Sequence, residues 1–583
     1  MAIPKQPLNE LMQTIKANIT RYRTQQASLP ESANWHLKRT TSTDLTSTIM
    51  ALYEEPEIEY TTRTADQEVC AVEICPDHPE YMIIGTYSLV KKDDRRDYEA
   101  QTRRGTIQVM PVAATFKPKY AGMLAPQLDR VAFPCAVLDL HFHPADSTLL
   151  GVATSNAQMQ FFRFVKHGDV LGRRVITKLL PLGVATVAEA DEHGLVPLVT
   201  QFTWFPETRT HGVSGINDVQ EIVFAVTTSL GETRVVHTAV PAIRGLFDQR
   251  LSTQSSEPLA VKAVDVHKHD LEAWTVAAVP LGYDVLDDGS HDATLHRLIL
   301  SGGDDSALIA SMVEMPAHAP DSSGPSEPDE AATDITPLWK DRRSHTAGVV
   351  AILPLPRLQA ADDNNSSPGP GPGGRQDAST IVPLVTGSYD EFIRVYELDV
   401  DRHPHRAAFQ TELRLGGGVW RLKVLDQYSD ISSIDDSAST NNTNRSTNTP
   451  SSTSTSIQPN PQHYHNHHTL VLASLMHGGA AILRLTRTHC MSVTSPHSHT
   501  NTANPRPTRS SPQPADSWTI TPLATFRTGH ESMVYCCDAW LEEPKTYTYT
   551  IVSTSFYDMK ICTWKYVDRF KADIFQNRNQ GQG

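Results

Sequence analysis

Acidic and histidine side chains recur beside short aromatic segments, a combination that could carry general acid–base chemistry. In the stretch TGSYDEFIRVYEL, Asp390 and Glu391 are adjacent and follow Tyr389. Asp304 is the first acid of SGGDD, and His477 stands in LMHGG. A carboxylate or an imidazole with a pKa near neutral pH can activate water, so Asp304, Glu391 and His477 are the candidate catalytic residues.

Aromatic side chains lie in or near the same stretches, which favours a cationic ligand. Aromatic faces bind quaternary ammonium groups, and nearby carboxylates add charge attraction. The candidate ligand-binding residues are Tyr389, Trp420, Tyr557, Trp274 and Glu272. Trp420 could equally belong to a core at the start of a strand. The glycines of GGGVWR and MHGG could present N–H groups to an oxyanion, or could simply form turns.

Composition argues against several other classes of protein. The formal charge of −15 disfavours a general nucleic-acid binder, which needs a basic face. No apolar run approaches the ~20 residues of a membrane span, and the first residues do not resemble a signal peptide. The seven cysteines are scattered without a CxxC pair. We therefore expect a cytoplasmic protein with no membrane contact, no cofactor and no metal site.

The acidic stretches are copies of one repeat, which offers a structural role for some of the acids. SGGDDSALI, TGSYDEFIRVYEL and STSFYDMKICTWKY each lead from small residues to an aspartate, with an aliphatic residue three positions later. The pattern indicates a strand, a tight turn and a second strand. Asp305, Asp390 and Asp558 are therefore expected to hold turns. Tyr389 and Glu391 are less constrained by the repeat.

Seven such units predict an all-β fold, a seven-bladed β-propeller. At about 40–45 residues per blade the propeller needs roughly 300 residues, so residues 69–566 must contain large insertions. Residues 1–60 form an N-terminal extension, part of which, within Thr46–Tyr60, is expected to supply the strand that closes the ring. Residues 567–583 are expected to be a C-terminal tail.

Four polar tracts, near 316–334, 361–380, 429–468 and 494–517, are predicted to be long disordered loops because they contain few apolar residues. In a propeller these tracts would all leave the same face. We expect the site on the opposite, compact face, although such insertions can instead mark a binding face. The tract HYHNHH (463–468) could bind metal, but its histidines have no ordered spacing.

The repeats resemble WD repeats, with only Trp564 at the namesake tryptophan position. More specifically, SGGDD, SHTAGVVAI, TGSYDEFIRVYEL, GGGVWRLKV, LMHGG, GHESMVY and STSFYD occur in this order. Across residues 69–566 this set resembles the diphthine methyl ester hydrolase family, often called the diphthine methyltransferase family, of the diphthamide pathway. GTYSL and HDLEAW fit as well.

The resemblance implies a methylesterase that hydrolyses diphthine methyl ester on translation elongation factor 2 to give diphthine, in diphthamide biosynthesis. The expected partner is that elongation factor, with no direct nucleic acid, and the protein is expected to be a monomer. The resemblance supplies no catalytic residues. The rival interpretation is a non-catalytic WD-repeat scaffold or adaptor, the usual role of this fold.

Three histidines occupy different positions in these repeats, which gives them different expected roles. His345 and His530 fall where WD repeats often carry a structural histidine. His477 replaces the turn aspartate of other copies, so it is the most informative of the three as a general base. The alternative is that His477 is an ordinary turn residue.

Overall fold

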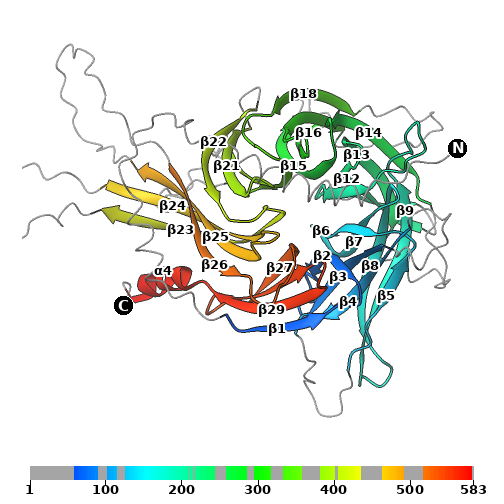
Figure 1. The fold of residues 1–583 in the computed structure, drawn as a ribbon, viewed down its shortest axis with the longest axis horizontal. Helices are drawn as coiled ribbons and strands as arrows, with labels where there is room; N and C mark the ends of the chain where they lie inside the picture. The colour runs from blue at the N-terminus through cyan, green and yellow to red at the C-terminus, as the bar shows by residue number, and fades with distance from the viewer. Residues whose placement is uncertain are drawn as a thin grey trace, which may run out of the picture.

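The computed structural model describes residues 58–89, 102–113, 125–207, 209–213, 217–242, 258–284, 294–316, 333–357, 381–400, 405–434, 462–491 and 517–580. Their strands form seven antiparallel sheets placed side by side around a central axis (Figure 1). Each sheet is one blade, and the first strand of each blade lies nearest the axis. The seven-bladed β-propeller predicted from the sequence is confirmed.

Blades 1 to 3 are given from the axis outward. Blade 1 contains β2 (Glu68–Ile74), β3 (Tyr81–Leu89), β4 (Arg103–Pro111) and β5 (Arg130–Phe133). Blade 2 contains β6 (Val137–His143), β7 (Asp146–Thr154), β8 (Gln158–Gly168) and β9 (Val175–Thr186). Blade 3 contains β10 (Val199–Trp204), β12 (Asn217–Thr228), β13 (Glu232–Pro241) and β14 (Val261–Lys268), with β11 (Arg209–Val213) paired to β12.

Blades 4 to 6 follow the same order. Blade 4 contains β15 (Ala273–Asp284), β16 (Thr294–Gly303), β17 (Leu308–Pro316) and β18 (Asp334–Asp341). Blade 5 contains β19 (Val349–Pro354), β20 (Ile381–Ser388), β21 (Phe392–Asp399) and β22 (Ala407–Arg414). Blade 6 contains β23 (Arg421–Ile434), β24 (Gln462–Ser474), β25 (Ala480–Met491) and β26 (Ser517–Phe526).

Blade 7 joins the two ends of the described chain. It contains β27 (Val534–Glu543), β28 (Thr548–Ser555) and β29 (Lys560–Val567), and its fourth strand is β1 (Tyr60–Thr64). β1 pairs with β29 from Tyr60 opposite Trp564 to Thr64 opposite Lys560. The closing strand thus precedes Val69, but it overlaps the predicted range Thr46–Tyr60 only at Tyr60. Residues 46–57 lie outside the described residues.

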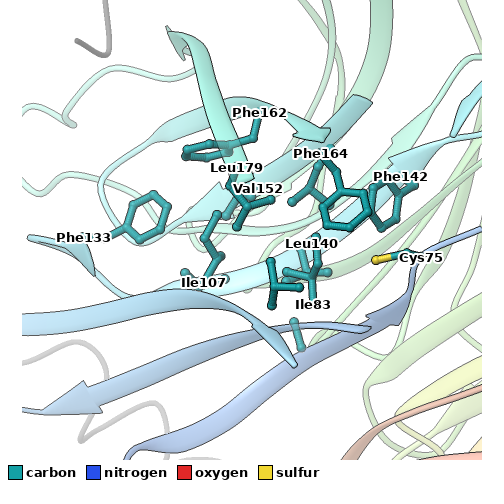
Figure 2. Packing of buried hydrophobic residues seen from close by; sticks show 14 of the residues in the cluster. Cys75, Ile83, Ile107, Phe133, Leu140, Phe142, Val152, Phe162, Phe164 and Leu179 are labelled. Carbon is teal, nitrogen blue, oxygen red and sulfur yellow. The ribbon is translucent and has the colours of Figure 1, made fainter. Parts of the chain in front are cut away.

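The core is divided into layers between neighbouring blades, because strand side chains alternate between the two faces of each sheet. One layer joins blades 1 and 2 and includes Ile83, Ile107, Leu140, Val152 and Phe162 (Figure 2). Similar apolar clusters join each further pair of neighbouring blades, including blade 7 to blade 1. An eighth cluster lies across the start of the first strands.

The ends of the polar tract 429–468 are ordered strands, which corrects the prediction of a disordered loop there. β23 continues to Ile434 and β24 begins at Gln462, with Ser429 opposite His467 and Tyr428 opposite His468. His468 is buried and its ring lies 3.0 Å from the Asp430 carboxylate and 2.9 Å from the Thr486 hydroxyl. Hydrogen-bonded polar pairs therefore extend the hairpin beyond the apolar part of the sequence.

The other tracts also fall in the connections between first and second or third and fourth strands. Tract 361–380 joins β19 to β20 and lies outside the described residues. Tracts 316–334 and 494–517 join third to fourth strands, and three of their four outermost residues, Pro316, Asp334 and Ser517, are the ends of strands. The opposite face therefore holds the turns between second and third strands and the links between blades.

The chain ends in a helix, α4 (Arg569–Gln580), where the sequence predicts only a tail. Asp568 caps it, since its carboxylate accepts a 3.1 Å hydrogen bond from the Lys571 N–H. Lys571 pairs with Asp426 of β23. The Arg484 guanidinium of β25 lies over the Phe570 ring, 3.7 Å from the ring centroid. These contacts dock α4 against blade 6.

Candidate functional site

A β-bulge at the start of the first strand recurs in six blades and turns one side chain in each. In five of these blades the pairing register of the first strand skips one residue directly after its first paired residue, and in blade 1 it skips one after the second. A bulge adds an unpaired residue and re-aims its side chain. Trp420 stands at the equivalent place in blade 6, directly before β23. The residues skipped are Cys70, Leu138, Thr200, Trp274, Val350 and Tyr535.

A second ring of positions comes from the turns that join second to third strands. Two residues beyond the last paired residue of the second strand stand Asp304, Tyr389, Met476 and Phe556, in blades 4 to 7. The Asp304 N–H donates a 2.9 Å hydrogen bond to the Glu272 carbonyl, so this turn lies over the start of its own first strand. The Tyr389 and Phe556 amides make matching bonds.

Side chains from both rings pack into one cluster at the compact face, here called the mouth cluster. Its aromatic members are Tyr87, Trp274, Tyr389, Trp420, Tyr535 and Phe556. Trp420 lies in the middle, with ring centroids 5.6 Å from Trp274, 5.9 Å from Tyr389 and 5.1 Å from Tyr535. Phe556 extends the run, 5.3 Å from Tyr535. Turns from distant blades thus build one continuous aromatic surface.

Asp304 is an acid at a turn position that is aromatic or Met in blades 5 to 7. A Cβ added at Gly348 would lie 2.8 Å from Asp304 Oδ1 and 3.0 Å from the Tyr389 ring, so a glycine leaves room for both. Burial and the neighbouring Glu272 carboxylate raise the pKa of Asp304 to about 7, although the Trp274 indole partly opposes the shift. A base with this pKa changes its charge near neutral pH.

Three buried polar atoms in this part of the mouth cluster lack a hydrogen-bond partner. They are Asp304 Oδ2, Trp274 Nε1 and the Tyr389 hydroxyl. Burial, followed by the charge of Asp304, holds the pKa of Tyr389 well above its usual range, so the phenol keeps its proton. Buried polar groups are normally hydrogen-bonded, so each exception calls for an explanation such as a catalytic role or a bound water. The Trp274 indole is directed toward Asp304, which leaves the Asp304 oxygen and the Tyr389 hydroxyl for a bound molecule.

The other predicted binding residues lie at the edge of the mouth cluster. Glu272 is half-buried and directly precedes β15. Tyr557 is 42% exposed, and its ring centroid lies 5.1 Å from that of Phe556. His477 is exposed in the turn of blade 6, next to Met476, which enters the cluster. The structure thus joins Trp274, Tyr389 and Trp420 to Asp304 and places the remaining residues around them.

Glu391, contrary to expectation, is directed away from the centre. Its backbone is left-handed, with φ of 71°, and its carboxylate lies 2.9 Å from the Arg414 guanidinium. Arg414 is the last residue of β22, the outermost strand of blade 5. An acid already paired at the blade's outer edge is a poor general base, so Glu391 leaves the set of catalytic candidates.

Asp305, Asp390 and Asp558 bind backbone groups at their turns. Asp390 accepts hydrogen bonds of 3.1 Å from the Thr346 and Phe392 amides. Asp305 accepts one from the Ala307 amide, and Asp558 accepts one from the Glu531 amide. Each carboxylate therefore ties its turn to backbone nearby.

Both predicted structural histidines, His345 and His530, are hydrogen-bonded, and His345 is buried. His530 Nε2 lies 2.8 Å from the Ser553 hydroxyl, which also accepts a 3.1 Å bond from the Trp564 indole. His345 Nε2 lies 2.9 Å from the Thr386 hydroxyl. Burial lowers the pKa of both imidazoles to about 4, so they stay neutral at physiological pH. The imidazole and the indole of blade 7 thus share one serine hydroxyl.

Sequence reasoning missed three aromatic members of the mouth cluster: Tyr87, Tyr535 and Phe556. The signal was present in the repeat register. Tyr535 follows Val534 as Trp420 follows Val419, and Phe556 holds the turn position of Tyr389. Aligning blades by strand pairing, instead of by the turn aspartate, would have brought Tyr535 and Phe556 into the candidate set.

Two searches of the described residues bear on other classes of site. Among these residues, no group of three or more His, Cys, Asp or Glu side chains is placed to hold a metal ion. No helix in the described part of the chain is both long enough and apolar enough to cross a membrane. Residues 465–468 of the histidine tract lie in β24, where alternate side chains face opposite sides of the sheet.

Comparison with known proteins does not assign this chain to a family. No family model matches the sequence, and no curated protein matches it. Among solved structures, the chain is similar to the crystal structure of Sqt1 from Chaetomium thermophilum, with 12% sequence identity and a TM-score of 0.37. The alignment covers 87% of this chain and 100% of that one. The assignment as a seven-bladed β-propeller therefore rests on the seven sheets of the chain itself.

Proposed function

We propose that this propeller is a carboxylic ester hydrolase, a protein methylesterase that converts diphthine methyl ester on translation elongation factor 2 to diphthine. The observation that carries the proposal is the Asp304 carboxyl group. It lies in an aromatic cluster, has a pKa of about 7 and has an oxygen without a hydrogen-bond partner. The ordered sequence segments that resemble the methylesterase family support the choice of substrate.

The mouth cluster suits the cation that this substrate carries. Diphthine methyl ester has a trimethylammonium group, which aromatic faces attract by about 0.5–2 kcal/mol per contact. Trp420 offers one such face, and the Trp274 and Tyr389 ring centroids each lie within 6 Å of the Trp420 centroid. Glu272 adds a negative charge at the edge of the cluster. The formal charge of −15 on the whole chain also favours a cationic substrate.

In the proposed reaction, Asp304 acts as general base toward one water molecule. The water oxygen attacks the ester carbonyl while Asp304 Oδ2 takes its proton. The Tyr389 hydroxyl donates a hydrogen bond to the oxyanion of the tetrahedral intermediate. The carbon–oxygen bond to the methoxy group then breaks, and Asp304 returns the proton to the departing methoxide to give methanol. The other water proton stays on the new carboxylic acid, which releases it to solvent and becomes a carboxylate. The Trp274 indole orients the Asp304 carboxyl group.

Access to Asp304 requires movement of the half-buried Tyr389 ring. The edge of the mouth offers apolar surface to a protein substrate, because Leu271 and Tyr557 are exposed. Leu271 directly precedes Glu272. We therefore propose that the elongation factor docks at the compact face. The compartment that we propose for the reaction is the cytoplasm.

The test is methanol release from elongation factor 2 that carries the methyl ester. Asp304→Asn should lower turnover by about 10²-fold or more, because proton transfer by a positioned base contributes that much. Glu391→Gln, which alters an acid at the outer edge of blade 5, serves as the matched control and should keep wild-type turnover.

A scaffold would give a different result in the same assay. If the wild-type protein binds the modified elongation factor and releases no methanol, the propeller is an adaptor and the esterase proposal fails. If methanol is released equally by the Asp304→Asn protein, the esterase proposal stands and the assignment of the base fails.

A further inference from the structure

A cavity of about 260 Å³ lies in the central channel, next to the mouth cluster. First strands of blades 1, 2, 5, 6 and 7 line it, through residues of β2, β6, β19, β23 and β27. Arg421 links the two regions, since its guanidinium lies 5.4 Å from the Trp420 ring centroid and its side chain lines the cavity. One water needs only about 10–15 Å³, so the cavity has room for a small organic ligand.

Charged side chains line this cavity, and none takes part in the proposed hydrolysis. His141 lies between two carboxylates, with Nδ1 3.1 Å from Glu73 Oε2 and Nε2 3.1 Å from Asp139 Oδ2. Burial alone would lower the pKa of His141, but Asp139 and Glu73 outweigh it and raise the pKa to about 10. His141 is therefore an imidazolium cation at neutral pH.

A second cation faces the same space. Lys423 pairs with Asp538, whose carboxylate also accepts hydrogen bonds of 2.6 Å from the Ile74 amide and 2.7 Å from the Ala539 amide. These amides hold Asp538 in the wall between β2 and β27. The ammonium group of Lys423 has no such covering.

The cations and the acids differ in how much surface they present. Of the side-chain surface, 39% is accessible for His141 and 42% for Lys423, and both residues line the cavity. Only 16% is accessible for Glu73, 5% for Asp139 and 2% for Asp538. Both N–H groups of His141 are taken by Glu73 and Asp139, so His141 contributes positive charge alone. The Lys423 ammonium has three N–H groups and keeps open donor positions toward the space.

We propose that the channel cavity binds a small oxyanion, a carboxylate or a phosphate, between His141 and Lys423. Lys423 donates charge-assisted hydrogen bonds to the anion without leaving Asp538, and His141 adds positive charge while both of its N–H groups stay on Glu73 and Asp139. Leu140, Leu353 and Leu422 provide an apolar wall for the remainder of an organic acid. This site is separate from Asp304 and does not depend on the esterase proposal.

The experiment is calorimetric titration of the full-length protein with sodium acetate or with inorganic phosphate, against sodium chloride at equal ionic strength. The expected result is saturable binding of at least one oxyanion. Lys423→Gln and His141→Gln should each weaken that binding about tenfold or more, since the first removes a charged donor and the second removes the neighbouring positive charge. Lys565→Gln removes a similar pair with Glu542 at the outer surface and should leave binding unchanged.

Loss of Lys423 leaves Asp538 without its cation, so the fold of the Lys423→Gln protein is checked by circular dichroism. If the single variant unfolds, Lys423→Gln combined with Asp538→Asn removes both charges and should again lose oxyanion binding. The proposal is overturned if neither acetate nor phosphate binds saturably to the wild-type protein. It is also overturned if the His141 and Lys423 variants bind as the wild type does.

Discussion

The acid pairs in the turns of blades 4 and 5 look alike in sequence and differ in structure. In blade 5, Tyr389 occupies the mouth position, Asp390 holds the turn and Glu391 faces the outer strand. In blade 4 the acid pair is displaced by one position, so that Asp304 stands at the mouth and Asp305 holds the turn. A shift of one residue within the repeat therefore converts a structural acid into a candidate base.

The surroundings of the two acids produce opposite pKa shifts. Burial alone would raise the pKa of Asp390, but its hydrogen bonds to Arg394, at 2.9–3.0 Å, lower it below the usual value. Burial also raises the pKa of Asp304, and Glu272 adds to that rise instead of offsetting it. The presence or absence of a guanidinium partner thus separates the two roles.

The largest expected effect on stability comes from replacing Asp390, the acid that holds the turn of blade 5. Asp390→Ala should lower the free energy of unfolding by about 3–5 kcal/mol, because it leaves the buried Arg394 without its main partner and removes two amide contacts. Turnover per folded molecule should stay near wild type. Chemical denaturation and methanol release measure the two quantities. A variant that is fully stable would contradict the assigned role of Asp390.

Asp304 should have the opposite effect on stability, with a defined pH dependence. Its folded pKa of about 7 lies above the unfolded value near 3.8, so the folded state binds the extra proton between these values. Stability contributed by this group is therefore present below about pH 4, falls as pH rises to about 7, and is constant above that. Relative to Asp304→Asn, the wild type should lose roughly 2–4 kcal/mol over this range.

Denaturation of both proteins at pH 4, 5.5, 7 and 8 checks this expectation. The comparison uses the difference between the two proteins, so that titration of other groups cancels. A difference that does not change with pH would mean that Asp304 does not retain its proton in the folded state, and the base assignment would lose its physical support.

The repeat pattern was sufficient to predict seven blades and the turn aspartates, because both depend on local strand and turn chemistry. It was not sufficient to predict which side chains enter the mouth. Tyr535 enters through a β-bulge, which shifts the register without a glycine or proline to mark it. The exclusion of Glu391 depends on Arg414, which is 23 residues away in sequence. Both features follow from strand pairing between distant segments, which a single sequence does not specify.

A smaller effect is expected when Asp304 is displaced without being removed. Gly348→Ala would place a methyl group 2.8 Å from Asp304 Oδ1 and 3.0 Å from the Tyr389 ring, so both must shift. Turnover should fall about tenfold, since a small misplacement of a catalytic group already costs rate. Gly168→Ala is the matched control, because no atom lies within 4 Å of the added group. Equal turnover of both variants would show that the position of Asp304 does not matter.

The smallest effect should come from Glu391, one of the two acids that the sequence placed near the centre of the compact face. Its carboxylate pairs with Arg414, whose side chain is more than half exposed, and such pairs contribute about 0–1 kcal/mol. Glu391→Gln should therefore change the free energy of unfolding by less than about 1 kcal/mol and leave methanol release unchanged. His477→Ala should behave similarly if Asp304 is the base. A large loss of turnover in the His477 variant alone would move the base from blade 4 to blade 6, because His477 stands on the same face of the propeller.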